Sequence, residues 1–570
     1  MQKNAYLKKD IIIIIVLAAT VTVFRLVLGG LMMIKFSPDS IYDDTMQFLK
    51  VISILNGEWL GGFGPMTLVK GVGYPLLTAL FSTLNLPYVF AYHLLYIIAC
   101  IIFVMAIKPI LKNKWLSLVI YVLLIYNPIA FSSELTRLYR DIGYYSVAFI
   151  AIGTATGLLL RYDKLKEGFI WGGFAGLSLA FAISFREDSQ WLVLFSVGCM
   201  LVFVFAGLFN TQNKDVLLKI LVVPVIAGLC FFCYTGAVSY INYSHYGYFA
   251  TNDYNSGAYA RAYGALSRLG TNENPYVTIP EEQRRQLYTL SPAFAELEWC
   301  LENEDSMYRE WVRVQGEYRV GYFSFVLRDV VAATGHYSSA QEANEYYERL
   351  AREVNEICDS GLMPSGARRT GVVARYYNWM LSPIIKAWGY EVISVLRCDG
   401  IDPTPQPIEG DDKYLRVFEE YTHEEIAAVR YYEDGTTNEN FVLSGGKVFL
   451  WYCCKLLIFA YKILLPILFI ASLGVYLCTG ILMFVRKRNN LEIWISWICA
   501  GALLCAFLVR CAMLAFVHVS SFPVIGYAPY QAATYPVLLS FCVTALTVGY
   551  NVFVEAGFNK REPEEKNLSI

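Results

Sequence analysis

The residues from Ile11 to Ile34 read IIIIIVLAATVTVFRLVLGGLMMI, an unbroken apolar run with a single charged residue, Arg25. A helix rises about 1.5 Å per residue and the hydrocarbon core of a bilayer is roughly 30 Å thick, so this run is long enough to cross it. The run is longer than the apolar core of a signal peptide and has no small-residue cleavage site. It therefore predicts a retained first membrane span.

Apolar runs recur along the 570 residues, of which 56% are hydrophobic and 16% charged. An average soluble domain carries about 25% charged residues. This composition excludes a disordered chain, a nucleic-acid-binding protein and an ordinary cytosolic enzyme. The formal net charge of -2 gives no global field that would attract a polyanion. The sequence predicts an all-α polytopic membrane protein in contact with membrane lipids and without a nucleic-acid partner.

Lysine and arginine are concentrated in alternate linkers between the apolar runs. The positive-inside rule places these linkers, and both termini, on the cytoplasmic side of a cell membrane. The remaining segments, 35–87, 132–142, 185–189, 244–445 and 517–531, are then extracytoplasmic. The basic groups are Lys3/Lys8/Lys9, Lys108/Lys112/Lys114, Arg161/Lys164/Lys166, Lys214/Lys219, Arg486/Lys487/Arg488 and Lys560/Arg561/Lys566.

Two runs decide the number of spans. Residues 73–86 (GYPLLTALFSTLNL) would form a helix of only about 21 Å, so we expect them to lie at the interface or to re-enter the membrane. Residues 446–485 are too long for one span. Lys455 and Lys462 in their first half favour an interfacial helix followed by one span at 463–485. The resulting prediction is about ten spans.

The chain is expected to have three parts. Residues 1–243 form a transmembrane module that includes the outer loop 35–87. Residues 244–445 form a large extracytoplasmic domain, which is polar, rich in tyrosine and mostly helical by pattern, and long enough to fold as a domain. Residues 446–570 supply the interfacial helix, the last transmembrane helices and a cytoplasmic tail.

Polar side chains near the membrane are costly, and those of the first outer loop are candidates for function. Adjacent Asp43 and Asp44 raise each other's pKa, which suits a general base or a cation site. Helix N-capping or plain solvation is the alternative. Lys70 follows as a candidate cation, or as a side chain that reaches to the membrane surface.

The second outer loop carries Glu134, Arg137 and Asp141 at spacings that can share one helix face. The alternative is an interfacial helix end whose charges pair with one another. Either arrangement predicts charged side chains at the outer membrane surface.

The third outer loop holds Arg186, Glu187 and Asp188 within a few residues, as a functional group or as a tight charged turn. Arg510 lies inside a later span near its outer end. An arginine at this depth requires an acidic or phosphate partner unless it reaches outward to the interface. Together, the three loops predict that carboxylates and cations converge on the outer face.

This arrangement resembles the GT-C superfamily of integral-membrane glycosyltransferases, most of all the bacterial branch related to protein O-mannosyltransferases and lipid A aminoarabinose transferases. The resemblance covers roughly residues 1–245 and rests on the acidic pair after the first span, the second-loop charges, Asn56 to Trp59 (N-G-x-W), and Lys70 to Leu76. The family's Lys-Pro-Pro reads Lys70-Gly71-Val72-Gly73-Tyr74-Pro75 here, and the Trp-Trp-Asp-Tyr-Gly signature of oligosaccharyltransferases is absent.

The resemblance implies an enzyme that moves a sugar from a polyprenyl-phosphate donor to an extracytoplasmic glycan, lipid or protein, with inversion in one displacement. Asp44 would take the proton of the acceptor, with Asp43 as the second choice. Outer-face cations would hold the donor phosphate, namely Lys70, Arg186 and Arg510. Glu134, Arg137, Asp141 and Glu187 would bind substrate. No cofactor is certain, and a divalent cation is an option.

Two other classes of protein stay open. A transporter or flippase of lipid-linked glycans usually has internal repeats and charges at the membrane midplane, whereas the charges here group at the outer face. A non-catalytic envelope protein that presents its external domain would have no need of Asp43 or Asp44.

Overall fold

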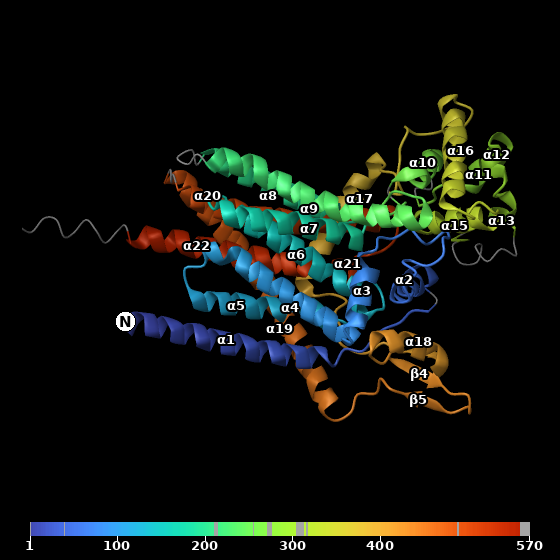
Figure 1. Ribbon diagram of the computed structural model, residues 1–570. Coiled ribbons are helices and arrows are strands. Elements are labelled where there is room, and N and C mark those ends of the chain that lie inside the picture. The colour runs from blue at the N-terminus through green and yellow to red at the C-terminus, as the bar shows by residue number, and fades with distance from the viewer. Residues whose placement is uncertain are drawn as a thin grey trace, which may run out of the picture.

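The computed structural model describes residues 2–558 except 39, 210–214, 255, 271–275, 304–312, 315–316 and 487–489. Several basic residues behind the topology prediction, namely Lys214, Lys487, Arg488 and those of the tail at 560–566, lie outside the described residues. The protein is a bundle of long helices with two polar parts at one end (Figure 1).

Among the described residues, nine helices are long and apolar enough to cross a membrane. The N-terminus and the end of the last helix lie together at the end of the bundle opposite the polar parts (Figure 1). The predicted class, an all-α polytopic membrane protein, is confirmed. The nine helices are α1 (Gln2–Gly29), α4 (Tyr88–Ile107), α6 (Asp141–Leu159), α7 (Leu165–Phe185), α8 (Gln190–Phe209), α9 (Asp215–Tyr246), α19 (Gly446–Val485), α20 (Leu491–Ser520) and α22 (Thr534–Phe558).

A tenth full span is not present in the described chain, because α5 (Lys114–Ile125) has only 12 residues and is about 18 Å long. The helix ends at Ile125, and Asn127 caps the following turn, because its side chain accepts a hydrogen bond from the N–H of Ile129 and Pro128 has no N–H with which to continue α5. Two 3-10 turns, η3 (Pro128–Phe131) and η4 (Ser133–Thr136), carry the chain onward to the polar end of the bundle.

Two expectations about other apolar runs have different outcomes. Helix α3 (Gly73–Thr83) is 11 residues long and is not among the candidate spans, in agreement with the sequence. The predicted break in 446–485 is wrong, because α19 is one continuous helix of 40 residues with Pro466 inside it. Lys455 does not require an interfacial helix, since its ammonium lies 2.6 Å from the carboxylate of Asp402 in the polar part.

The isolated charge of the first span has a partner inside the bundle. Arg25 donates through Nε to the carbonyl of Ile125 at 2.7 Å, and its Nη2 lies 3.0 Å from Nδ1 of His93. The guanidinium also lies 4.2 Å from the ring centre of Phe131. These contacts tie α1 to α4 and to the end of α5, and they satisfy two polar groups that would be costly in lipid.

The segment 244–445 does not have a single core. Residues between Ala258 and Met363 form a hydrophobic cluster of their own. Residues such as Val395, Phe418 and Ile426 belong instead to the main cluster of the bundle. The first part contains α10 (Gly257–Leu266), α11 (Glu281–Leu290), α12 (Pro292–Ala295), α13 (Glu298–Glu302), β1 (Arg313–Val314), β2 (Glu317–Tyr318), α15 (Val320–Ala333) and α16 (Ala340–Asp359).

The second part of this segment packs directly on the bundle and carries a small sheet. Helix α17 (Leu381–Arg397) lies along α20 and α19. Strand β4 (Ala428–Tyr431) pairs in parallel with β3 (Ile408–Asp411) and antiparallel with β5 (Thr437–Glu439), and α18 (Asp412–Thr422) follows β3. In Figure 1 this part and the α10–α16 part lie at the same end of the bundle, with α2 (Met46–Leu55) and α3 between them.

Candidate active site

The two aspartates of the first outer loop have different surroundings. Both lie in a π-helical turn (Ile41–Thr45) that precedes α2. The side chain of Asp44 is fully buried, forms an ion pair of 2.6 Å with Nε of Arg137, and accepts a hydrogen bond of 3.0 Å from the N–H of Ser37. The side chain of Asp43 is 37% exposed and pairs with Lys70. Asp43 is therefore the accessible carboxylate of the pair.

Lys70 uses all of its hydrogen-bond donors inside the protein. Its ammonium donates to the carbonyl of Tyr42 at 2.6 Å, to the hydroxyl of Tyr139 at 3.0 Å, and to the carboxylate of Asp43. A lysine has three N–H donors. The charge also lies 5.5 Å from the ring centre of Phe325, which belongs to the external helix α15. Lys70 thus fixes the loop and holds Asp43 in place.

The second outer loop is attached to the first through the backbone. Lys35 and Arg137 form a parallel bridge, and this places the Arg137 guanidinium between the aspartates, with Nη2 3.6 Å from Asp43. Glu134 points to Lys35 instead, at 2.7 Å. The predicted common face of Glu134, Arg137 and Asp141 is not formed, because η4 ends at Thr136 and α6 begins only at Asp141.

The third outer loop connects the remaining predicted charges. Arg186 pairs with Asp141 and, at 2.9 Å, with Asp188. Asp188 also lies 2.8 Å from Nη1 of Arg510, so it bridges two arginines. Glu187 pairs with Arg140.

Most of the predicted site residues therefore lie in one cluster of ion pairs at the polar end of the bundle. Only Glu134 stands apart, in its own pair with Lys35. The sequence missed Tyr139 and Arg140, which lie between the predicted charges. The predicted residues in the cluster are Asp43, Asp44, Lys70, Arg137, Asp141, Arg186, Glu187 and Arg510.

Burial and ion pairing affect the two aspartates in opposite directions. Burial alone would raise the pKa of Asp43, but the charges of Lys70 and Arg137 outweigh it and hold this pKa well below its usual range. Burial raises the pKa of Asp44 to about 7, because the nearby Arg137 does not fully compensate the loss of solvent. Near neutral pH, Asp43 is ionised whereas Asp44 is close to its midpoint.

An apolar groove of about 640 Å³ runs among the spans below this cluster. Its walls come from α3, α4, α6, α7 and α9, and include Leu77, Ile150, Phe174 and Tyr234. At one end the hydroxyl of Tyr234 lies 2.7 Å from that of Ser184. A Cβ on Gly71 would lie 2.2 Å from the carbonyl oxygen of Ser184, so only glycine fits here. The groove thus ends beside the residue that follows Lys70.

The external part touches the site through α15. The ring of Tyr42 stacks on Phe325 with 5.2 Å between ring centres, and its hydroxyl donates to Asp329. Tyr42 precedes Asp43 directly and its carbonyl binds Lys70. The external part therefore completes one wall of the cluster.

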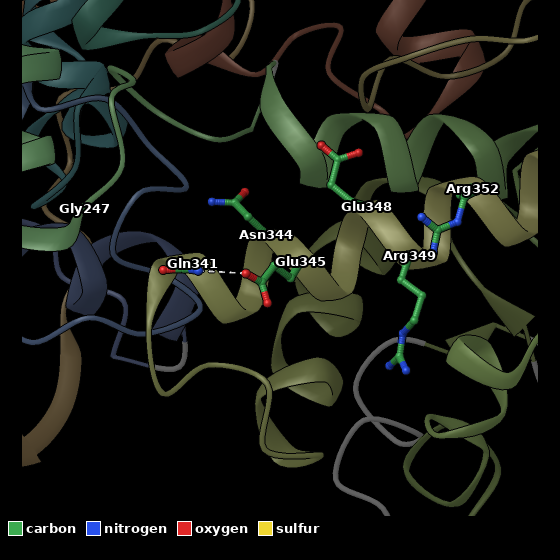
Figure 2. A pocket seen from close by; sticks show the side chains of 7 residues that line it. All are labelled: Gly247, Gln341, Asn344, Glu345, Glu348, Arg349 and Arg352. Atoms are coloured by element: carbon green, nitrogen blue, oxygen red, sulfur yellow. Dashed lines mark hydrogen bonds between the residues drawn. The ribbon is translucent and has the colours of Figure 1, made fainter.

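A separate polar hollow of about 530 Å³ lies on the external part, between the end of α9 and α16 (Figure 2). Its walls are Gly247, Gln341, Asn344, Glu345, Glu348, Arg349 and Arg352. Gln341 donates to Glu345 at 2.8 Å, one turn further along α16. Apart from Gly247, every residue of this wall has a polar or charged side chain, which suits a hydrophilic ligand.

Metal ligation finds no support in the described part of the chain. It contains no group of three or more His, Cys, Asp or Glu side chains that could hold a metal ion. The carboxylates of the cluster face lysine and arginine instead.

No family model and no curated protein matches the chain. Two solved structures of ArnT from Cupriavidus metallidurans are similar to it. The apo structure has a TM-score of 0.27 and 10% identity, over 96% of this chain and 78% of that one. The structure bound to undecaprenyl phosphate has a TM-score of 0.30 and 11% identity, over 89% and 78%. Similarity at this level transfers no residue roles, and those proposed below rest on the contacts of this chain.

Proposed function

We propose that this protein is a membrane glycosyltransferase that moves a sugar from a polyprenyl-phosphate donor to an extracytoplasmic acceptor. The observation that carries the proposal is the apolar groove that ends beside a cluster of cations in which the carboxylate of Asp43 is accessible. A groove in lipid surroundings suits a prenyl chain, and the cluster suits the phosphate and the reacting sugar.

Cations of the cluster assist departure of the phosphate. As the bond between the anomeric carbon and the phosphate oxygen breaks, the electron pair and negative charge move onto the phosphate. Fixed positive charges stabilise this charge in a site that excludes water. Lys70, Arg186 and Arg510 were expected in this role, and each is already in contact with a carboxylate. They contribute positive electrostatic potential to the site, while the carboxylates paired with them hold them in position.

Asp43, rather than Asp44, is our choice for the base. Asp43 is the exposed carboxylate, whereas Asp44 is buried behind it against Arg137. Asp43 takes the proton of the acceptor hydroxyl while the acceptor oxygen bonds to the anomeric carbon from the face opposite the phosphate. One displacement of this kind inverts the anomeric centre. Asp44 orients Arg137, and Arg137 in turn orients Asp43.

The remaining predicted residues hold the loops that frame the sugar. Glu187 joins Arg140 to the N–H of Gly71, and Asp141 fixes Arg186. Glu134 acts more remotely, through Lys35. The acceptor, whether glycan, lipid or protein, binds on the external part, for which the hollow on α16 is a candidate (Figure 2).

The protein would lie in the cell membrane with the cluster extracytoplasmic and both termini cytoplasmic. In Figure 1 the described ends of the chain lie at the end of the bundle opposite α2 and α18, and the turn that precedes α2 carries Asp43 and Asp44, which supports termini and cluster on opposite sides of the membrane. A reporter enzyme fused near residue 110 is expected on the cytoplasmic side.

The proposal is tested by sugar transfer in proteoliposomes. The purified protein receives a panel of radiolabelled polyprenyl-phosphate sugars and an extract of cell envelopes, and labelled product and released polyprenyl phosphate are measured. We expect Asp43→Asn to reduce transfer by roughly 100-fold or more, which is the range for removal of a general base. The matched control is Asp434→Asn, a change in an exposed turn where Asp434 bonds only its neighbour Thr436.

Three outcomes would contradict parts of the proposal. No transfer with any donor, together with movement of the intact lipid across the membrane, would indicate a flippase. Full activity of Asp43→Asn with loss in a folded Asp44→Asn would return the base to Asp44. Full activity of both variants would remove the carboxylates from the chemistry.

A further inference from the structure

Helix α2 carries two buried polar side chains that have no hydrogen-bond partner among the described residues. Gln47 and Lys50 are three residues apart, so they lie on the same side of the helix. Gln47 is 0% exposed and Lys50 is 4% exposed. Within the part of the chain that the structure describes, neither the amide of Gln47 nor the ammonium of Lys50 has a hydrogen-bond partner.

An unpaired buried ammonium is expensive. Removal of such an ion from water costs several kcal/mol unless an opposite charge and hydrogen bonds compensate. The charges around Lys50 are Lys70 and Arg140, which repel it, and Glu187 and Asp253, which attract it. Both carboxylates are already engaged, because Glu187 binds Arg140 and Gly71, and Asp253 binds Arg328 at 2.8 Å.

The other cations of the cluster each form an ion pair with a carboxylate, although Nε of Arg140 and of Arg510 also has no hydrogen-bond partner among the described residues. Lys70 spends its three donors on Tyr42, Asp43 and Tyr139. Arg186 and Arg510 both contact Asp188. Within the described residues, Lys50 is thus a cation without a hydrogen-bond partner or an ion pair, and the amide N–H groups of Gln47 beside it have no partner either.

We propose that Lys50 and Gln47 form the binding site for the phosphate of the lipid-linked donor. The proposal rests on the proposed function and identifies which residues receive the anion. Lys50 donates charge-assisted hydrogen bonds to the phosphate oxygens and Gln47 donates from its amide. Lys70 remains bound to Asp43 and contributes positive electrostatic potential at the phosphate. The groove that ends beside Gly71 delivers the phosphate next to Lys70, whose charge acts on Lys50.

A purely structural role for Lys50 makes a different prediction about the stabilisation that a bound phosphate brings. If Lys50 only fills space, Lys50→Met removes an unpaired buried charge and raises the melting temperature without any effect on a ligand. If Lys50 binds the phosphate, the same variant is more thermostable alone but loses the stabilisation that the phosphate brings. Both quantities come from one thermal unfolding experiment.

The experiment uses the full chain in lipid nanodiscs and three probes: a C55 polyprenyl phosphate, the corresponding polyprenol, and inorganic phosphate. Thermal unfolding and equilibrium binding are measured for wild type, Lys50→Met, Lys50→Arg, Gln47→Leu and Lys108→Met. Lys108 is an exposed lysine at the far end of α4 and serves as the matched control.

We expect wild type and Lys108→Met to bind polyprenyl phosphate at least tenfold more tightly than polyprenol. In Lys50→Met this preference for the phosphate should disappear, in Gln47→Leu it should fall several-fold, and Lys50→Arg should retain most of it. Inorganic phosphate that binds wild type but not Lys50→Met would show that the headgroup alone suffices. Binding of the lipid phosphate only would show that the chain must occupy the groove.

A pH series supplies a second readout. Burial lowers the pKa of Lys50 to about 7, with Lys70 and Arg140 acting in the same direction and Glu187 and Asp253 opposing them. The guanidinium of Lys50→Arg stays charged at any pH used. The affinity of wild type for polyprenyl phosphate, divided by that of Lys50→Arg, should therefore fall about tenfold per unit above pH 7.

The outcomes separate the two proposals. If wild type does not distinguish polyprenyl phosphate from polyprenol, the proposed function itself fails. If wild type prefers the phosphate and Lys50→Met keeps that preference, the phosphate site lies elsewhere and only the assignment of Lys50 is overturned.

Discussion

Asp188 and Arg510 form an ion pair of 2.8 Å between the third outer loop and helix α20, 322 residues apart in the sequence. Arg510 is almost fully buried, with 1% of its side chain exposed, while that of Asp188 is 36% exposed. A second arginine, Arg186, shares the same carboxylate at 2.9 Å. This single aspartate therefore joins the C-terminal helices to the loops that carry the site.

Asp188→Asn is predicted to destabilise the protein more than Arg510→Met. Loss of the aspartate leaves the buried Arg510 without a carboxylate, whereas loss of the arginine leaves Asp188 paired with Arg186. Breaking a buried pair costs about 3–5 kcal/mol, and the partial exposure of Asp188 reduces our expectation to roughly 2 kcal/mol. Thermal unfolding of both variants and of the double variant measures the coupling. Equal losses of unfolding free energy in the two single variants would contradict this asymmetry.

The titration of Asp44 should appear in the pH dependence of stability. Burial raises the pKa of this group from 3.8 to about 7, so the folded protein binds its proton more tightly than the unfolded chain. Stability should therefore fall as pH rises from about 4 to 7, by on the order of 4 kcal/mol from this group. Asp44→Asn should flatten that part of a plot of melting temperature against pH.

The flattening in Asp44→Asn will be partial, because burial also raises the pKa of Glu391 and of Glu424 to about 7. These groups give a residual slope of the same sign. Asp434→Asn is the control, because hydrogen bonds from Thr436 lower the pKa of Asp434 and its titration adds almost no slope above about pH 5. An unchanged slope in Asp44→Asn would show that Arg137 keeps Asp44 ionised throughout.

The sequence predicted the fold class and the meeting of three outer loops because both follow from charge placement. Each apolar run must span the membrane or pack beside it, and lysine and arginine in alternate linkers determine the direction of each run. Residues such as Asp43, Arg137 and Arg186 then lie at one membrane face. Their convergence required only the correct topology, which is why the outer cluster could be predicted.

Individual pairs could not be predicted, since they depend on side-chain direction within a turn. Asp43 and Asp44 are neighbours in the sequence, but the π-helical turn exposes one and buries the other. The sequence favoured Asp44 as the base, and nothing in the residue order separates the two. Lys50 was likewise hidden within an apolar helix, where its only signal was a charge among Phe48, Val51 and other buried residues.

Gly71→Ala is predicted to disrupt the site although it adds one methyl group. The new Cβ would lie 2.2 Å from the carbonyl oxygen of Ser184, which is backbone and cannot rotate away. The chain after Lys70 must shift, and the hydrogen bond of 2.8 Å from the Gly71 N–H to Glu187 is lost. Overpacking of this kind costs about 1–3 kcal/mol. Thermal unfolding and sugar transfer should both decline.

Gly198→Ala is the matched control for Gly71→Ala. Gly198 lies within α8 and has nothing within 4 Å of its Cβ position. Alanine favours a helix over glycine by up to about 1 kcal/mol, so this variant should be as stable as wild type or more stable. Equal behaviour of the two alanine variants would mean that the contact between Gly71 and Ser184 is not rigid.

Filling the apolar groove should weaken binding of the prenyl chain without loss of the charged cluster. Ile150 lines the groove of about 640 Å³, so Ile150→Trp places a bulky ring where the chain would lie. We expect at least a tenfold loss of affinity for polyprenyl phosphate, measured in nanodiscs, while inorganic phosphate binding stays unchanged. Leu194 lies on α8 and is 66% exposed, so Leu194→Trp adds the same ring outside the groove. This variant should bind the lipid as wild type does. If Ile150→Trp bound the lipid normally, the chain would have to follow another path among the spans.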